Sequence, residues 1–347
     1  MELYVYDRTD GLVDVLERTT SVRWRRKYFE PGEVEIHVPA TLENRELLAE
    51  GRIIRRTDRE ESAIIEEIDI DEDDLAVTGR MLSSLLERAI LSQRYTLHMP
   101  PEQAMLALIP EGTRVVPELS AAGAAGVGSP DNIETQVTYK NLLTAEERLA
   151  RASGLGFRVL FQPGAMIFQV YEGVDRTVLQ SQRPFVLFSD EFGNLASPRY
   201  TKTSKNYKNR AYVAGAGEGD DRVVVVVDLS QGEEVRELYV DARDIQQDAD
   251  TSLEEYQALL RQRGLEQLAS CVKVESFEGD GEDVENFRYR VDWDLGDLVS
   301  VQYTRLGITM HERITEVEEV YEKGVFTFTP TFGSPLPEKL DLGDDTE

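Results

Sequence analysis

Alternating hydrophobic and polar positions dominate the first 80 residues and predict antiparallel strands. Residues 34–38 place Val, Ile and Val on one face and polar side chains on the other, which is the pattern of a half-buried strand. Residues 3–6 alternate in the same way, and a Thr-Asp-Gly turn then lets residues 12–16 return as a partner strand. Residues 64–70 and 75–78 flank four acids and predict a hairpin with an acidic tip.

Helical spacing replaces this alternation after residue 80. Apolar residues recur every three and four positions over residues 81–90, which predicts a helix with one apolar face. Pro101 favours the first turn of a second helix, over about 101–108. Thr144 and the Glu three residues later form a capping box for a third helix over about 145–153. Between these helices, residues 120–132 are rich in Ala, Gly and Ser and predict a flexible loop that is disordered or orders only in an assembly.

The chain returns to strand patterns in its second half. Two alternating segments between residues 157 and 170 predict a hairpin. Five consecutive valines at 223–227 predict a strand that is buried on both faces or lies at a subunit contact. Thr251 and Glu254 form a second capping box, for a long helix near 252–269. Residues 287–291 alternate again, and further strands follow at 299–303 and around a turn at 323–324.

Together these elements predict a mainly β protein with an α+β insert. We expect a first β domain in residues 1–79, an α+β insert section in 80–194, and a second β-rich section in 195–333 that includes the helix near 252–269. Residues 334–347 are rich in Pro and acids without an apolar period, so we expect a flexible acidic tail. The two β-rich ends are compatible with two antiparallel β-barrel-like domains on either side of the helix-containing section.

Charge excludes several classes of partner. The 347 residues include 38 Lys and Arg against 66 Asp and Glu, a formal net charge of −28. Binding to nucleic acid or to an anionic membrane needs clustered basic side chains, so we expect no sequence-specific nucleic-acid binding. No run of 18 apolar residues occurs, and the first residues lack the basic region of a signal peptide, so we expect no stable membrane insertion and synthesis in a cytoplasm.

Residues that could carry chemistry are few. His37, His98 and His311 are the only histidines, none lies at metal-ligand spacing from another, and we expect surface or boundary positions for them. The single cysteine, Cys271, allows no internal disulfide, and we expect a small buried residue there. The sequence therefore predicts no catalytic residue, no metal site and no cofactor.

Three acidic or glycine-rich segments have patterns that could carry chemistry. Residues 215–220 superficially resemble a phosphate loop, but their acids and the strand that follows favour a hairpin tip. Residues 71–74 lack the ligand spacing of an EF-hand and also favour a hairpin tip. Residues 292–297 form the densest cluster of acids and aromatics. A strand end and tight turn is favoured there, with a calcium site, or a carboxylate pair doing acid-base work, as alternatives.

The order of several short motifs resembles the siphophage tail-hub proteins of the Gp37-like kind. The early strand signature Phe-Glu-Pro-Gly-Glu-Val-Glu-Ile-His-Val-Pro at 29–39 and the strand-to-helix junction at 77–86 carry the first part of the resemblance. The matching segments that follow in order are 183–185, 191–195, 206–215, 239–245, 263–264, 294–297 and 330–333. The resemblance spans residues 1–333; it rests on joint order and spacing, since no one motif is specific.

This resemblance implies a trimer of β-barrel-like domains, similar to the hubs of contractile tails and of type VI secretion spikes. Such a ring adapts the six-fold tail tube and distal tail ring to a three-fold tip. It implies a non-enzymatic virion structural protein at the tail tip, assembled in the bacterial host cytoplasm. Its implied partners are further copies of itself, the distal tail ring and tail tube proteins, the tape measure protein, and a tip or fibre protein. Longer relatives carry enzyme or fibre domains after the hub, which we do not expect here.

Two alternatives from other classes remain open at this stage. A tail-tip cell-wall hydrolase or endopeptidase would rest on acids such as Asp294 and Asp297. A receptor- or carbohydrate-binding tail protein would use Trp24 or Trp293 as an exposed platform, although both are expected in cores.

Overall fold

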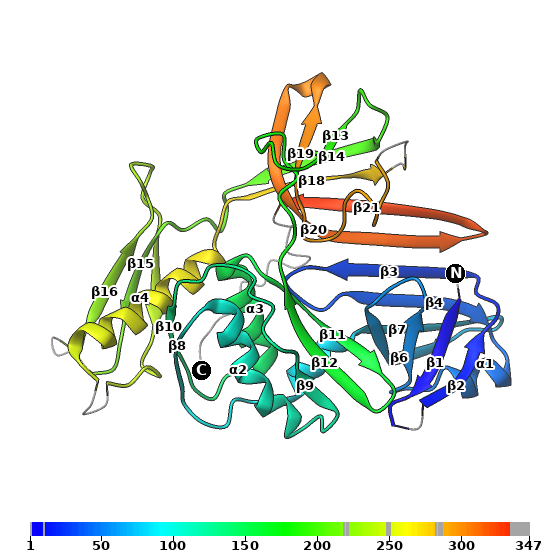
Figure 1. Ribbon diagram of the computed structural model, residues 1–347, viewed down its shortest axis with the longest axis horizontal. Helices are drawn as coiled ribbons and strands as arrows, with labels where there is room; N and C mark the ends of the chain where they lie inside the picture. Colours follow the sequence, from blue (N-terminus) through cyan, green and yellow to red (C-terminus); the bar gives the residue numbers. More distant parts are fainter. Residues whose placement is uncertain are drawn as a thin grey trace.

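A computed structural model describes residues 2–9, 11–217, 219, 222–247, 251–281, 283 and 287–333. Its largest element is a sheet of thirteen strands that contains both ends of the described chain (Figure 1). The strands of this sheet are β1 (Leu3–Asp7), β2 (Gly11–Leu16), β3 (Ser21–Lys27), β4 (Glu33–Pro39), β5 (Ile53–Arg56), β6 (Ser62–Ile70), β7 (Asp74–Met81), β13 (Leu187–Ser189), β14 (Leu195–Thr203), β18 (Val274–Gly281), β19 (Leu298–Tyr303), β20 (Ile308–Glu322) and β21 (Val325–Gly333).

The N-terminal half of this sheet follows the alternation of the sequence. Its strands run in the order β3-β4-β7-β6-β5-β1-β2, and every neighbouring pair is antiparallel. Val34, Ile36 and Val38 are buried and the residues between them are not. The same face is covered by the short helix α1 (Leu42–Leu47) and the chain after it, where Leu48 is fully buried. The acids at 71–73 form the turn between β6 and β7, and Asp74 begins β7, so the predicted hairpin with an acidic tip is present.

The C-terminal half adds β14, β18, β21 and β20, with β13 and β19 attached at the side of β20. Its core is aromatic: Phe188 packs edge-on against Trp293 and Phe332, at centroid distances of 5.0 and 4.6 Å. The short η3 helix (Thr304–Leu306) connects β19 to β20. Residues 287–291 alternate as a strand would, but they belong to a tight turn instead. The chain reverses at Arg290, whose φ is 64°, and the Arg290 N–H donates to the carbonyl of Trp293 at 2.7 Å.

The two halves join where β3 pairs antiparallel with β20. The register runs from Ser21 opposite Glu322 to Lys27 opposite Glu316, so segments about 300 positions apart in the chain are neighbours. Each half supplies the partner for the edge of the other, which removes two exposed strand edges. The fold class is therefore confirmed as mainly β with a helix-containing insert. The strands pair as one open sheet, however, and its described pairings do not close into a barrel.

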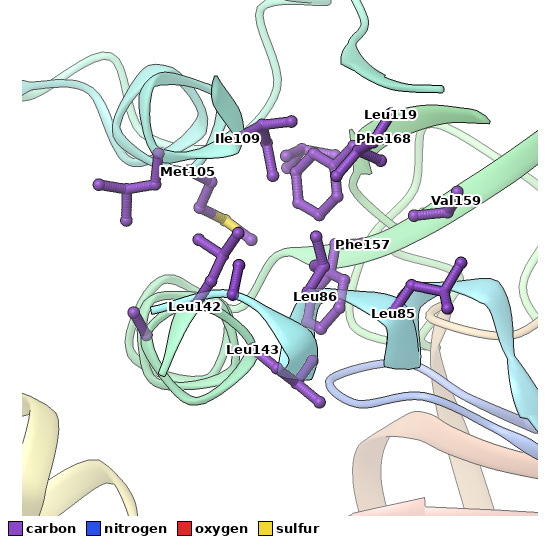
Figure 2. Close-up of a cluster of buried hydrophobic side chains, with 14 of the residues drawn as sticks. Leu85, Leu86, Met105, Ile109, Leu119, Leu142, Leu143, Phe157, Val159 and Phe168 are labelled. Atoms are coloured by element: carbon purple, nitrogen blue, oxygen red, sulfur yellow. The ribbon is translucent and has the colours of Figure 1, made fainter. Parts of the chain in front are cut away.

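The insert folds around its own core beside this sheet. It contains η1 (Leu82–Arg88), β8 (Tyr95–Met99), α2 (Pro101–Thr113), β9 (Leu119–Ala121), β10 (Ile133–Val137), α3 (Leu142–Ser153), β11 (Gly156–Gln162) and β12 (Ala165–Tyr171). Figure 2 shows how side chains from η1, α2, α3 and the β11–β12 hairpin converge there; those labelled are Leu85, Leu86, Met105, Ile109, Leu119, Leu142, Leu143, Phe157, Val159 and Phe168.

A smaller unit lies at the far side of the insert. It contains β15 (Arg210–Ala214), β16 (Val224–Asp228), β17 (Glu237–Asp241) and α4 (Leu253–Ala269), with α4 packed on one face of the three strands (Figure 1). The strands β15 and β16 form the hairpin predicted around the glycine-rich segment, of which residues 218 and 220 lie outside the described residues. The predicted tail at 334–347 also lies outside them. No described helix is long and apolar enough to cross a membrane.

Several helix boundaries differ from those predicted. The helix expected over 81–90 is a short 3-10 helix, because Met81 is still the last residue of β7 and Ala89 is already extended. The helix expected near residue 145 begins at Leu142, because the side chain of Asn141 accepts from the N–H of Thr144 and so caps it. Ser252, not Thr251, caps α4 and forms the capping box with Glu255.

Two further expectations differ from the structure. The helix expected over about 101–108 extends from Pro101 to Thr113. The loop at 120–132 is held in place, because the buried carboxylate of Glu102 accepts three consecutive backbone N–H groups, from Ala125, Gly126 and Val127, at 2.6–3.1 Å. The composition of the loop could not predict this contact, because the carboxylate that holds the loop lies on α2.

Glu146 on α3 generates a prediction about stability. Its side chain is fully buried, neither carboxylate oxygen has a hydrogen-bond partner among the described residues, and burial raises its pKa well above the ordinary value. A raised pKa favours the folded state below about pH 4.3, and this contribution is lost as the pH rises through the folded pKa. We expect Glu146→Gln to increase the free energy of unfolding at pH 8 by about 1–3 kcal/mol.

Urea denaturation at pH 5 and pH 8 measures this effect. Glu87→Gln is the matched control, because 53% of the Glu87 side chain is exposed and its carboxylate lies 2.8 Å from the guanidinium of Arg80. The Glu146 variant should show a smaller loss of stability between the two pH values than the unsubstituted protein and the control. An unchanged pH dependence in Glu146→Gln would contradict the proposed buried, neutral carboxyl.

Candidate functional site

The junction of β3 and β20 has a different charge pattern on each face. On the exposed face, cross-strand ion pairs connect three neighbouring strands. The Arg25 guanidinium lies 3.2 Å from Glu316 and 3.0 Å from Glu318 on β20, and 3.4 Å from Glu33 on β4. Burial raises the pKa of Glu316 to about 7, although Arg25 and Lys27 beside it act to lower that pKa. Opposite charges on adjacent strands support this register.

The buried face holds an ionic cluster with two centres, which we call the junction cluster. It consists of Arg26, Arg56, Asp58, Arg59, Glu61, Tyr289, Asp294 and Glu319. Arg26 is the first centre. Its guanidinium donates to Glu61 at 2.7 and 3.0 Å, to the Tyr289 hydroxyl at 2.8 Å and to Asp294 at 2.6 Å.

Glu319 is the second centre, and its carboxylate is fully buried. Arg56 at the end of β5 and Arg59 in the loop that follows donate to it, at 2.6 and 2.7 Å. The Tyr289 hydroxyl accepts from Arg26 and donates to Glu319 at 2.8 Å, so it connects the two centres. The cluster therefore links β3 and the β5–β6 region of the N-terminal half to β20 and the 289–294 turn of the C-terminal half.

Electrostatics in this cluster follow from burial and pairing. Burial is the largest single influence and raises the pKa of Glu61, but the charge and hydrogen bonds of Arg26, together with the charge of Arg158, outweigh it and lower that pKa to about 2. Burial likewise opposes the charge of Arg26, but Glu61, Tyr289 and Asp294 raise its pKa well above the ordinary value. Buried carboxylates and guanidiniums that satisfy each other in this way act as a clamp between elements.

The acids singled out at 292–297 have structural partners. Asp294 belongs to the junction cluster through Arg26. Asp297 is buried and accepts from the Arg176 guanidinium at 2.8 Å and from the backbone N–H of Val174 at 2.8 Å. It fixes the segment after β12 against the start of β19, so both carboxylates are engaged in ion pairs between elements. No group of three potential metal ligands occurs among the described residues, which gives the calcium alternative no support.

The other residues considered for chemistry also lie in structural positions. His37 contacts Asp74 at 2.6 Å and Glu35 at 2.9 Å, and these hydrogen bonds raise its pKa. His98 pairs with Glu134, His311 lies 2.9 Å from the Ser300 hydroxyl, and Cys271 is half-buried. Trp24 and Trp293 are buried, with 0% and 1% of their surface exposed, as expected for core residues. Neither can serve as an exposed binding platform.

The valine run provides a different kind of surface. The strand β16 alternates, so Val225 and Val227 pack on α4 while Val224 and Val226 are half exposed; the prediction of burial on both faces was wrong. On the same outer face, Tyr212 of β15 lies opposite both Val226 and Tyr239. Val224, Val226, Tyr212 and Tyr239 form an apolar row, which we call the outer row; α4 leaves it uncovered.

The junction cluster was missed at the level of sequence, although a signal for it exists. Arg26 occupies the same alternating phase of β3 as the buried residues Val22 and Trp24, and Glu319 follows Val317 in the buried phase of β20. A charged residue in the apolar phase of a strand requires a buried partner of opposite charge. The pattern could have indicated that partners exist, but it could not have identified them.

Removing one member of the junction cluster tests its contribution to stability. Glu61→Gln leaves the buried Arg26 with fewer counter-charges, so we expect the free energy of unfolding at pH 7 to fall by about 3 kcal/mol. Because the folded pKa of Glu61 is lowered to about 2, its contribution is present above about pH 4.3 and is lost as the pH falls through 2. The difference between Glu61→Gln and the unsubstituted protein should therefore shrink from pH 7 to pH 2.

Glu60→Gln is the matched control, because Glu60 pairs with Arg158 while 57% of its side chain is exposed. Exposed pairs contribute less than about 1 kcal/mol, so this variant should unfold close to the unsubstituted protein in urea at both pH values. Equal losses for Glu61→Gln and Glu60→Gln would contradict the clamp.

Comparison with known proteins shows which structures have a similar fold. No curated protein sequence matches the chain. Three solved structures share the fold over almost their whole lengths. A tail protein from Neisseria meningitidis MC58 has a TM-score of 0.60 at 13% identity, covering 96% of both chains. The 43 kDa tail protein of prophage MuSo2 from Shewanella oneidensis has a TM-score of 0.57 at 10% identity, covering 96% of this chain and 98% of that one.

The third is the prophage tail protein gp18 from Listeria monocytogenes EGD-e, with a TM-score of 0.55 at 13% identity, covering 95% of this chain and 94% of that one. At these identities the likeness concerns the fold. The sequence itself shows the family, because residues 2–334 match the family described as Siphovirus ReqiPepy6 Gp37-like protein. The chain belongs to this family of siphovirus proteins, as its motifs predicted.

Proposed function

We propose that this protein is a structural subunit at the tip of a phage tail or a phage-tail-like particle. In this proposal three copies form a hub ring, which adapts the six-fold tail tube and distal ring to a three-fold tip. The observation that carries the proposal is the membership of nearly the whole chain in the Gp37-like siphovirus family. The shared fold with three tail proteins over at least 94% of each chain supports it.

The architecture suits a part that transmits force without chemistry. One sheet contains both ends of the described chain, and the junction cluster links its halves through paired, buried charges. Breaking such a pair exposes an uncompensated buried charge, so sliding of one half past the other is opposed. The chain has four hydrophobic clusters. We propose that the parts of the chain around them move together as one body in the ring.

A ring also needs a surface on which neighbouring copies meet, and we assign that role to the outer row. The outer row exposes 61% of Tyr239 and 44% of Val226 on a sheet with only three strands. Tyrosine is enriched where proteins meet because it combines a large apolar ring with a polar end. Beside the outer row, Arg210 of β15 lies between Asp228 of β16 and Glu237 of β17, so charge alternates from strand to strand. In a second copy that is offset by one strand, opposite charges would face each other.

The remaining parts of the proposal concern location and partners. We propose assembly in the host cytoplasm and final placement in the virion tail tip. The proposed contacts are with the distal ring and tube proteins, the tape measure protein and a separate tip or fibre protein. The net charge of −28 supports the absence of nucleic-acid binding in this role.

We further propose that the protein is not an enzyme. A cell-wall hydrolase would need two carboxylates free to exchange protons with a substrate. Asp294 and Asp297 are instead held by Arg26 and Arg176 at 2.6 and 2.8 Å. A receptor-binding role through Trp24 or Trp293 lacks support in the same way, because both rings are buried.

Zymography on host cell walls tests the non-enzymatic proposal. We expect no lytic band from the purified protein, and none from Asp294→Asn. A band that the unsubstituted protein produces and Asp294→Asn loses would establish the hydrolase alternative. Mutanolysin run in the same gel verifies that the substrate is cleavable.

Light scattering coupled to size exclusion tests the ring. We expect a mass of three chains of 39.2 kDa at high concentration. The double variant Val226→Glu/Tyr239→Glu adds charges to the outer row and should shift the mass to one chain. Leu42→Glu is the control: it places one such charge at an apolar position on α1 that is 68% exposed, and it should leave the mass unchanged.

A single-chain mass of the unsubstituted protein over a wide concentration range would contradict self-assembly in solution. Loss of assembly in Leu42→Glu as well would show that added charge acts nonspecifically, and would contradict the assignment of the outer row. Circular dichroism of all variants shows whether each one is folded.

A further inference from the structure

A small open pocket lies beside the junction cluster, between the segment after β12 and the 290–297 turn. Its volume is about 260 Å³, and its lining includes the guanidiniums of Arg26, Arg158, Arg176 and Arg290. Three carboxylates also line it, those of Glu172, Asp294 and Asp297. The ionised groups at its surface thus sum to +4 − 3 = +1, in a chain whose net charge is −28.

Three of the four guanidiniums are bound within the protein. Arg26 serves the junction cluster, as described above. Arg158 pairs with Glu60 at 2.5 Å and lies over the ring of Tyr171, and the Arg176 Nε donates to Asp297 at 2.8 Å. Arg290 differs, because its hydrogen bond within the described chain is a donation from Nη1 to the backbone carbonyl of Asp58.

Two donors at this pocket lack acceptors among the described residues. The Nε of Arg290 is buried without a hydrogen bond, and the nearest carboxylate oxygen, on Asp294, is 3.8 Å away. The indole Nε1 of Trp293 is buried without one as well. Buried donors are almost always satisfied in folded proteins, so two unsatisfied N–H groups on residues that line one pocket make it a candidate site for an acceptor.

The backbone that carries these donors is strained. Arg290 has a φ of 64°, a conformation that residues with a Cβ rarely adopt. The turn is closed by the hydrogen bond from the Arg290 N–H to the Trp293 carbonyl, and both residues line the same pocket. Strain of this kind persists where the surrounding structure requires it, and often at binding sites.

We propose that this pocket binds one carboxylate, presented by an acidic side chain of a partner polypeptide. A net charge of +1 suits a monoanion better than a phosphate dianion, and a guanidinium fork matches the planar carboxylate. The volume is below that of ordinary small-molecule sites, so it accommodates a side chain rather than a metabolite. The proposal stands independently of the hub ring, because it rests on the donors of one chain.

Nuclear magnetic resonance of the indole N–H groups tests this directly. The chain has only two tryptophans, and Trp24→Phe assigns their signals. The Nε1 of Trp24 is also buried and unpaired but does not line the pocket, so it is the internal reference. We expect sodium acetate to shift the Trp293 indole signal in a saturable way, while sodium chloride at equal ionic strength and neutral acetamide do not.

Variants distinguish acetate binding in the pocket from a general effect of salt. Arg290→Gln should weaken acetate binding at least tenfold. Arg290→Lys keeps the charge but loses Nε, so it should also weaken binding, and it provides a second test if Arg290→Gln fails to fold. Arg199→Gln is the matched control, because 70% of that side chain is exposed and its nearest carboxylate is 3.9 Å away.

A peptide with the sequence of residues 70–75, the acidic hairpin tip of this chain, serves as the polypeptide probe. Tighter binding of this peptide than of acetate, at the same Trp293 signal, would support a second copy as the source of the side chain. Binding of acetate without any gain from the peptide would assign the carboxylate to another protein. The absence of a saturable Trp293 shift with acetate, or equal shifts in Arg290→Gln and Arg199→Gln, would overturn the proposal.

Discussion

The pairing of β3 with β20 is the constraint on which the rest of the molecule depends. It brings residues 21–27 against residues 316–322 and so makes one sheet out of the two ends of the described chain. Loop closure over such a separation costs entropy that local contacts cannot offset. The pairing can persist only because buried apolar side chains, Trp24 and Val317 among them, and the junction cluster act together at this position.

Burying several charges at that position has a cost as well as a benefit. Apolar residues of similar volume would often stabilise a core as well as or better than an ion pair. What the charged groups add is selectivity: Arg26 must face Glu61 and Asp294, and Glu319 must face Arg56 and Arg59, so a slipped register would leave buried charges unpaired. Such discrimination between registers would suit the proposed role as a tail subunit that keeps one shape. The same logic extends to Asp297 and Arg176, which fix the insert onto the start of β19.

Local structure could be predicted from the sequence where the pattern itself determines it. The strand at 34–38, the hairpin at 157–170 and the helix near 252–269 each carry their own periodicity or cap, and the structure has them close to the expected bounds. Long-range features could not be predicted, because alternation along β3 does not identify its neighbour. The valines at 223–227 look uniformly apolar, yet only the pairing with β15 and the position of α4 decide which of them are covered. The candidate site had one readable signal, a charged Arg26 in the phase of Val22 and Trp24.

Family membership, a joined sheet and carboxylates engaged in ion pairs fit the proposed role of a component that connects other proteins. In that proposed role, three copies surround the axis at the tail tip. Cryo-electron microscopy of intact tails tests this most directly. The expected result is a three-fold ring at the tip into which this fold docks, with the outer row between neighbouring copies. Density for this chain in the six-fold tube, or its absence from purified tails, would contradict the claim.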